Sequence, residues 1–423
     1  MALALTVLSL ALAYFSPAEL FPTLAPYHLQ LIMLLPAVAI SFLAMAIRGW
    51  GIQSPQYFLM IGLWFAVVVS NLSKLWFRDS LEAFQEFGVV VCIYFLVCVN
   101  ASSISRIRLL ASVVCVCGLI LAIEGILAYH TGLSADKLVI ERIEEGAGFY
   151  RRIRAYGILS DPNDFAQFLL VALALLGAHW KKGHPLLNIS LLTVPGAILI
   201  YAIYLTGSRG AMIGLAVVAF VALSNRLGTL LSVILTTVFF LLLMAAQFGG
   251  GRGITLHEPS AGGRIMAWGE GISMLKMNPL FGIGYMHFTE FHELSAHNSF
   301  VLCFAELGAF GYFFWFALIL TTVLGVHCLA KIPTTTPADR DLRSSATTIR
   351  AALYSFLATG WFLSRTYNVT LYVLLALAAS LIYLRHRAHQ TVAVPAGRWI
   401  PLTIGCEVAS IVAIYASIRV RSL

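Results

Sequence analysis

The longest polar interruption of an otherwise apolar sequence, residues 248–298, carries the side chains best suited to chemistry. It contains Arg252, Arg264 and Lys276 and ends at His297, where a new apolar segment begins. A guanidinium group binds phosphate through two parallel hydrogen bonds. An imidazole titrates near neutral pH, so it can accept a proton from a hydroxyl. Held at a membrane surface, this set suits chemistry on a phosphate-bearing lipid.

The segment after Gly262 and Gly263 has the pattern of an amphipathic helix lying in the membrane interface. Four apolar side chains recur there at a 3–4–3 spacing, which places them on one helical face. They are Ile265, Trp268, Ile272 and Leu275. Arg264 lies at the amino-terminal end of this helix, pointing toward a phosphate near the bilayer surface, and Asn278-Pro279 is expected to end it. The glycines of the preceding loop predict a mobile stretch that a substrate gate could use. They are Gly249, Gly250, Gly251 and Gly253.

The sequence Thr206-Gly207-Ser208-Arg209-Gly210 joins two apolar spans with almost no loop. Gly207 permits a sharp reversal, and Ser208 is a plausible N-cap for the second span. Arg209 then lies in the first helical turn, where free backbone N–H groups and the helix dipole also favour an anion. The position predicts a phosphate-binding arginine; a guanidinium contacting lipid headgroups is the alternative.

A second basic segment contains Arg151, Arg152 and Arg154 and runs into Asp161-Pro162. An aspartate followed by proline predicts a helix start, with the proline at the first helical position. Arg154 lies shortly before that helix enters the membrane, so we expect it to face the same cavity as Arg209. For Arg151 and Arg152, contact with anionic lipid explains the charge equally well.

Histidine is more often structural than catalytic, but the position of His297 beside cationic loops favours a general base. Asn298 could orient the imidazole or bind a sugar, and Glu306 must face protein or a cavity because an exposed carboxylate in lipid is costly. His287 and His292 precede His297 at five-residue intervals. On a helix this spacing turns successive side chains away from one another, so no metal site is expected.

The composition places these residues on a polytopic membrane protein. Hydrophobic residues make up 60% of the chain and charged residues only 11%, against roughly 25% charged in soluble domains. We predict an all-α fold with about twelve spans of the ~17–25 residues that a bilayer requires. The expected spans are 28–47, 56–76, 82–99, 107–129, 164–180, 186–205, 209–226, 228–247, 299–326, 347–366 and 368–384. Residues 2–15 are preferred as a first span, and 399–418 could be a further span or an interfacial helix.

The distribution of Lys and Arg in short loops predicts a cytoplasmic amino terminus. With that orientation the long loops 130–163 and 248–298 face the opposite side of the membrane. Few cations remain in short segments on that side: Lys74, Arg78, Arg209 and Arg365. Cations kept on the unfavoured face suggest an anionic partner there, although pairing with the glutamates of the same loops is an alternative.

Together these motifs resemble the O-antigen ligase and polymerase superfamily of bacterial envelope enzymes. The likeness covers roughly residues 150–320. It rests on Asp161-Pro162-Asn163, Thr206–Gly210, Gly262-Gly263-Arg264 with Trp268, the run Asn278-Pro279-Leu280-Phe281-Gly282-Ile283-Gly284, His297–Phe300 and Glu306-Leu307-Gly308. Within the superfamily the chain is most similar to the lipopolysaccharide O-antigen ligases, which work at the periplasmic face of the inner membrane.

The resemblance implies a glycosyltransferase that moves a glycan from undecaprenyl pyrophosphate to lipid A-core. Arg209, Arg264 and His297 fall on the functional arginines and histidine of the family. Arg154, Asn163 and Asn298 are expected to complete the pyrophosphate and sugar contacts. Membrane lipids are the other expected partners; no metal, cofactor or nucleic acid is expected.

Three other functions stay open from the sequence. O-antigen polymerases and protein O-oligosaccharyltransferases share much of the pattern, and a transporter of polyprenyl-linked glycan belongs to another class. A transporter would need a polar path through the bilayer, whereas the cations here gather at one face. The chain is expected to form a single membrane domain over residues 1–423, within which 248–298 is a long periplasmic loop.

Overall fold

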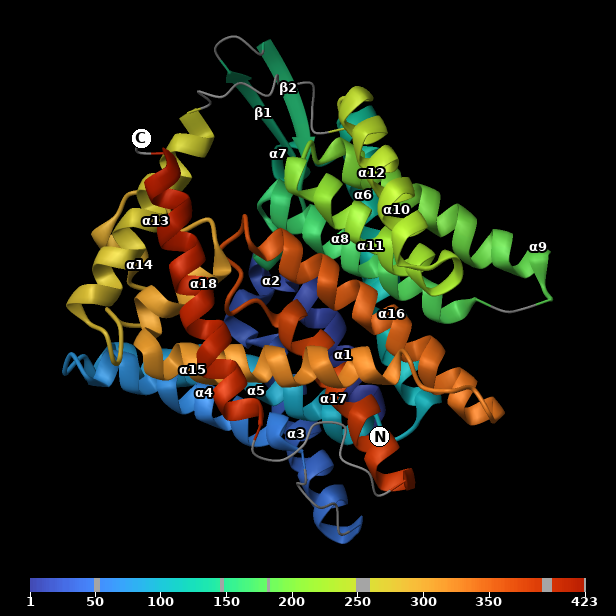
Figure 1. The fold of residues 1–423 in the computed structure, drawn as a ribbon, viewed down its shortest axis with the longest axis horizontal. Coiled ribbons are helices and arrows are strands. Elements are labelled where there is room, and N and C mark those ends of the chain that lie inside the picture. The colour runs from blue at the N-terminus through green and yellow to red at the C-terminus, as the bar shows by residue number, and fades with distance from the viewer. Residues whose placement is uncertain (49–53, 145–147, 181–182, 249–258, 390–397, 422–423) are drawn as a thin grey trace.

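The computed structural model describes residues 1–48, 54–144, 148–180, 183–248, 259–389 and 398–421, and within them the chain is a bundle of α-helices (Figure 1). The prediction of an all-α polytopic membrane protein is confirmed. The main helices are α1 (Ala2–Phe15), α3 (Leu29–Arg48), α4 (Pro55–Leu72), α5 (Phe77–Asn100), α6 (Ile104–Thr131), α8 (Pro162–Leu176), α10 (Val194–Leu205), α11 (Arg209–Leu227), α12 (Thr229–Ala245), α13 (Pro259–Met277), α15 (Ser299–Leu329), α16 (Pro337–Gly360), α17 (Val369–His389) and α18 (Trp399–Arg421). Short helical pieces connect them: α2 (Pro17–Leu20), α7 (Ala135–Leu138), α9 (Pro185–Asn188) and α14 (Phe288–Phe291).

Nine helices of the described chain are long and apolar enough to cross a membrane, and α1 and α12 are apolar but shorter. The segment left open at 399–418 is one of the nine, as α18. Nine in the described residues is fewer than the twelve or so that we predict, and besides α1 and α12 two of the expected spans are not among the nine. The span expected at 164–180 is α8, which ends at Leu176, and the span expected at 347–366 is α16, which begins at Pro337.

The early start of α16 has a local cause. The Thr336 side chain accepts a hydrogen bond from the backbone of Asp339, and the Asp339 carboxylate accepts one from the backbone N–H of Thr336. This reciprocal cap, with Pro337 at the first position, begins a helix before the apolar part of the sequence. Hydropathy alone misses such a start, because the first turns of α16 are rich in charged residues.

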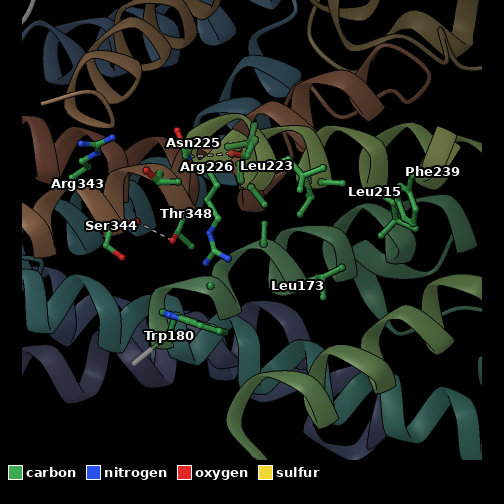
Figure 2. A pocket seen from close by; sticks show the side chains of 18 of the residues that line it. Leu173, Trp180, Leu215, Leu223, Asn225, Arg226, Phe239, Arg343, Ser344 and Thr348 are labelled. Atoms are coloured by element: carbon green, nitrogen blue, oxygen red, sulfur yellow. Dashed lines mark hydrogen bonds between the residues drawn. The ribbon is translucent and has the colours of Figure 1, made fainter. Parts of the chain in front are cut away.

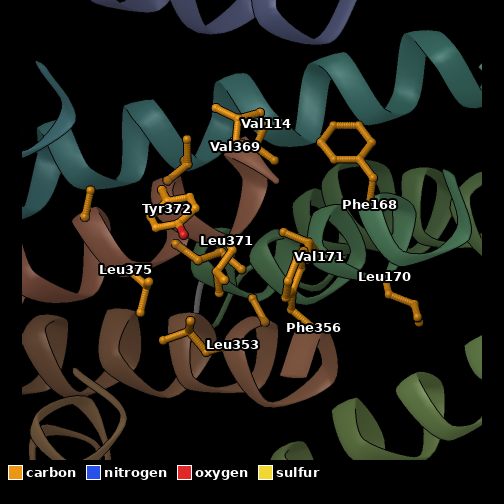
Figure 3. Close-up of a cluster of buried hydrophobic side chains, with 14 of the residues drawn as sticks. Val114, Phe168, Leu170, Val171, Leu353, Phe356, Val369, Leu371, Tyr372 and Leu375 are labelled. Carbon is orange, nitrogen blue, oxygen red and sulfur yellow. The ribbon is translucent and has the colours of Figure 1, made fainter. Parts of the chain in front are cut away.

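The helix α17 forms the middle of the bundle. It is apolar on all sides, and 78% of the residues in its most apolar stretch are buried. Figure 3 shows α17 side chains among those of α6, α8 and α16, including Phe168, Phe356 and Tyr372. Around this centre, α15 packs along α4, and α11 packs along α16. The packing brings the amino-terminal end of α8 close to the segment that joins α16 and α17, since α8 lies along α16.

One feature was not expected from the sequence. The loop predicted over 130–163 contains an antiparallel hairpin of β1 (Val139–Glu144) and β2 (Gly148–Ile153). Val139 pairs with Ile153, and Glu141 lies opposite Arg151, with 3.0 Å between the charged groups. The Ile153 side chain is buried and would meet a Cβ on Gly125 of α6 at 3.3 Å. The hairpin therefore stands on α6 instead of forming an irregular loop.

The helix α15 is interrupted at Gly308, whose φ of 62° lies in the left-handed region. The break leaves backbone carbonyls without partners in the helix, and the segment that precedes α14 supplies them. Ile283 and Gly284 donate their backbone N–H groups to the carbonyls of Ala305 and Glu306. Backbone groups at membrane depth need such partners within the protein. Close approach is possible because Gly282, with φ 71°, has no side chain; a Cβ there would clash with the Glu306 carbonyl.

The substitution Gly282→Ala tests this junction. It adds a Cβ against backbone and forces an alanine into a left-handed conformation, which costs about 1–2 kcal/mol before the clash is counted. We expect a melting temperature several degrees below that of the wild type in detergent. Gly405→Ala in α18 is the matched control, because nothing lies within 4 Å of that position. Equal melting temperatures for the two variants would contradict this account of the junction.

Candidate functional site

The candidate site lies where the start of α8, the start of α15, the segment between α16 and α17, and α13 come together. The start of α8 is the one expected from the sequence: Asp161 is the N-cap and its carboxylate accepts the backbone N–H of Asn163 at 2.7 Å. Pro162 occupies the first turn. The start of α15 is also as expected, with Asn298 as N-cap.

His297 is held in an unusual backbone conformation beside this start. Its φ is 46°, a left-handed value that is uncommon for a residue other than glycine and is found at functional sites. Its backbone N–H donates to the Ser364 hydroxyl at 2.8 Å. Next to it, the Ser299 hydroxyl donates to the Leu363 carbonyl at 2.6 Å and accepts the N–H of Arg365 at 2.9 Å. The segment between α16 and α17 thus fixes where the imidazole is presented.

Two charged groups act on the imidazole of His297. Burial lowers its pKa below the ordinary value of a histidine, the nearby Arg264 cation lowers it further, and the Asp161 carboxylate acts in the opposite direction. Arg264 and Asp161 therefore both lie near His297, although one is on α13 and the other precedes α8. At neutral pH the imidazole is uncharged, which is the form that can accept a proton.

This electrostatic arrangement is tested by titrating the histidines by NMR. The chain has 11 histidines, so the His297 signal is assigned by its loss in His297→Gln. We expect a His297 pKa below the ordinary value, because burial and Arg264 both disfavour the imidazolium ion. Arg264→Gln removes a positive charge and should raise that pKa, whereas Asp161→Asn removes a negative charge and should lower it. Unchanged titration of His297 in both variants would show that neither group lies near the imidazole.

An ion pair between a buried carboxylate and a half-buried guanidinium lies beside this cluster. The Arg365 guanidinium makes two hydrogen bonds to the carboxylate of Asp164, whose side chain is only 2% exposed. The pair joins the segment after α16 to the first turn of α8. Removing Arg365 would leave the buried carboxylate of Asp164 without a compensating charge, which is strongly destabilising. The sequence placed Arg365 on the expected outer face but gave no sign of its partner.

The turn between α10 and α11 is built as the sequence predicts. Gly207 has φ 58°, and Ser208 stands at the N-cap position of α11, without a side-chain capping bond. Arg209 is therefore the first residue of α11 and half-buried. The turn is joined to the start of α8 by Arg152, whose Nε donates to the Thr206 carbonyl at 2.5 Å.

Arg152, and not Arg154, is the hairpin arginine that contacts this turn. Besides Thr206 it binds the carboxamide oxygen of Asn163 at 2.9 Å, and it is 9% exposed. The Nε of Arg154 donates instead to the Lys137 carbonyl at 2.8 Å, at the base of the hairpin. Arg154 follows the last residue of β2, and its backbone N–H also donates to the Leu138 carbonyl, so these contacts lie with α7 and not with the turn before Arg209. A role for Arg154 in substrate binding stays a prediction.

The two asparagines expected near the substrate also have structural tasks. The carboxamide oxygen of Asn298 accepts the backbone N–H groups of Phe300 and Val301, and its side chain is fully buried. Asn163 bridges Asp161 and Arg152. Both positions support the residues around His297, and their direct contact with a sugar stays a prediction.

A helix, α13, covers the stretch expected to be amphipathic, and it ends at Met277, one residue before Asn278-Pro279. Trp268 and Ile272 are buried, and Trp268 meets Trp361 edge to face with 6.1 Å between ring centroids. The helix packs on α15 and α18, so that Arg264 in its second turn stands beside the start of α15. Arg252 and the glycines expected to form a gate lie outside the described residues.

The other histidines of the long loop lie in different surroundings. The ring of His287 stacks on Trp76, with 4.4 Å between centroids, and the Nδ1 atom of His292 lies 3.0 Å from the Leu294 carbonyl. Among the residues that the structure describes, no three His, Cys, Asp or Glu side chains are grouped so that they could hold a metal ion. His297 itself stands beside the guanidinium of Arg264, where an imidazole can take part in proton transfer.

Comparison with known proteins adds one finding. Residues 195–316 match the model of a family described as O-Antigen ligase. The matched stretch runs from α10 into α15 and includes Arg209, Arg264 and His297, but not Arg152 or Arg365. A search of curated proteins finds no match.

Proposed function

We propose that this chain, a member of the O-antigen ligase superfamily, is an inverting glycosyltransferase that moves an O-antigen glycan from undecaprenyl pyrophosphate to a hydroxyl of lipid A-core. Superfamily membership indicates a glycosyl-transferring enzyme in general. The observation that carries the finer proposal is the cluster in which half-buried His297, held by Ser364, stands beside the cation of Arg264 and the carboxylate of Asp161, with its pKa lowered by burial and by Arg264. A base next to a phosphate-binding cation is what transfer from a pyrophosphate requires.

In the proposed reaction His297 takes the proton of the acceptor hydroxyl as the hydroxyl oxygen attacks the anomeric carbon. A new C–O bond forms on one face of the sugar while the bond to the pyrophosphate oxygen breaks on the other, so the configuration inverts. Undecaprenyl pyrophosphate leaves with the bonding electrons. Arg209 and Arg264 neutralise its growing negative charge, a task that guanidinium groups perform through paired hydrogen bonds.

The remaining contacts position these groups. Ser364 holds the backbone of His297, and Arg152 ties the turn before Arg209 to the start of α8. Both lipid substrates would enter between helices from the bilayer. The distribution of Lys and Arg supports an active site at the periplasmic face of the inner membrane.

The proposal is tested with purified protein in detergent, a polyprenyl-pyrophosphate-linked glycan and lipid A-core. His297→Ala should lower the rate of transfer at least about 100-fold, because general base catalysis contributes roughly 10²–10⁴-fold. Binding of the donor should be largely kept. Arg209→Ala and Arg264→Ala should weaken donor binding, slow transfer, or both.

The matched control is His292→Ala, a histidine of the same loop whose ring contacts the backbone of Leu294 and the ring of Phe288. It should retain transfer. Near-normal transfer by His297→Ala would remove the catalytic assignment, and full activity after both arginine changes would contradict the pyrophosphate clamp.

The acceptor distinguishes a ligase from a polymerase of the same superfamily. In parallel reactions the enzyme receives either lipid A-core or a second polyprenyl-linked repeat unit. We expect product with lipid A-core and none with the repeat unit. The reverse result would identify a polymerase, and purified protein that makes no product with either lipid but moves the donor across a vesicle membrane would identify a transporter.

A further inference from the structure

A cavity of about 760 Å³ opens between α8, α10, α11, α12 and α16, away from the residues described above (Figure 2). Its walls are largely apolar, with Leu173, Leu215, Leu223 and Phe239 among them. The volume lies in the range of ~300–1,000 Å³ typical of small-molecule sites. Because α12 buries little of its surface and packs chiefly on α11, the cavity lies at the lipid-facing edge of the bundle.

Three arginines line this apolar space: Arg226 at the end of α11, and Arg340 and Arg343 in the first turns of α16. No aspartate or glutamate is among the lining residues, all of which belong to the described part of the chain. The two carboxylates nearest in sequence have other partners, since Asp339 pairs with Arg385 and Asp341 with Arg108. The cavity therefore carries a local excess of positive charge.

Groups that suit a phosphate ester surround these cations. The guanidinium of Arg226 lies over the ring of Trp180, 5.6 Å from its centroid, and Figure 2 shows it between α11 and that ring. Ser344 and Thr348 line the same space, and the Thr348 hydroxyl donates to the Ser344 carbonyl. An apolar wall ending in arginines, hydroxyls and an indole matches a molecule with hydrocarbon chains and an anionic head.

The cavity is separate from the candidate active site. Arg209 begins α11 and Arg226 nearly ends it, so the two arginines lie about 25 Å apart at 1.5 Å per residue. That separation approaches the ~30 Å thickness of the hydrocarbon core. Whichever leaflet holds the glycan donor, the cavity opens toward the other one.

We propose that this cavity binds an anionic glycerophospholipid of the leaflet opposite the His297 cluster. An acyl chain lies along the apolar wall between α11 and α12, and the phosphate binds Arg226, Arg340 and Arg343. A bound lipid would fill the space between the loosely packed α12 and the helices α8 and α16. It would thereby connect α12 to these two helices.

The test is native mass spectrometry of the full chain in detergent with phosphatidylglycerol or phosphatidylcholine added in equal amounts. We expect the wild type to retain phosphatidylglycerol at least about tenfold over phosphatidylcholine. The double change Arg226→Ala with Arg340→Ala should lower the retained phosphatidylglycerol at least fivefold. Ala222→Trp keeps the charges but fills the apolar wall, and it should lower retention of the same lipid as well.

Arg106→Ala is the control, because this arginine lies near Arg108, which pairs with Asp341 of α16, yet it does not line the cavity. It should bind phosphatidylglycerol as the wild type does. Equal retention of the two lipids, or wild-type retention by both cavity variants, would overturn the proposal. Displacement of phosphatidylglycerol by millimolar inorganic phosphate would also overturn it, since the site would then recognise a free anion. Melting curves separate loss of the lipid from loss of the fold.

Discussion

The hydrogen bonds between the segment after α16 and the start of α15 hold the candidate site together. They keep His297 in a left-handed conformation that its side chain disfavours, and they do so through the hydroxyls of Ser364 and Ser299. The Asp164–Arg365 pair fastens the same segment to α8. As a result, an imidazole in a loop acquires a fixed position between α13 and α8, where the charges of both helices act on its pKa.

Membrane burial explains why so much hydrogen bonding is concentrated around irregular backbone. The break in α15 at Gly308 would leave backbone groups without partners, and the run from Pro279 to Gly284 supplies them. The same run leads toward the loop that carries His297. The run from Pro279 to Gly284 has no reactive side chain, but it thus determines the path of the chain toward His297.

Local signals in the sequence predicted much of the fold and part of the site. The helix start at Asp161, the turn before Arg209 and the end of α13 are set by residues adjacent in sequence, and all three are confirmed. The hairpin and the contacts of Arg152 were missed, because a short basic strand looks like a loop when its pairing partner is unknown. The different contacts of Arg152 and Arg154 could not be predicted either, because they depend on how β2, α7 and the turn before Arg209 come together in space. The partner of Arg365 could not be predicted, since 201 residues separate it from Asp164.

The central claim is that one pyrophosphate lies between the arginines of α11 and α13, within reach of His297. The most direct measurement is a cryo-electron microscopy map of the chain with a non-transferable polyprenyl pyrophosphate sugar bound. The account predicts phosphate density contacting both Arg209 and Arg264, with the anomeric carbon facing the His297 imidazole. Phosphate density remote from either arginine, or a His297 ring turned away from the sugar, would contradict it.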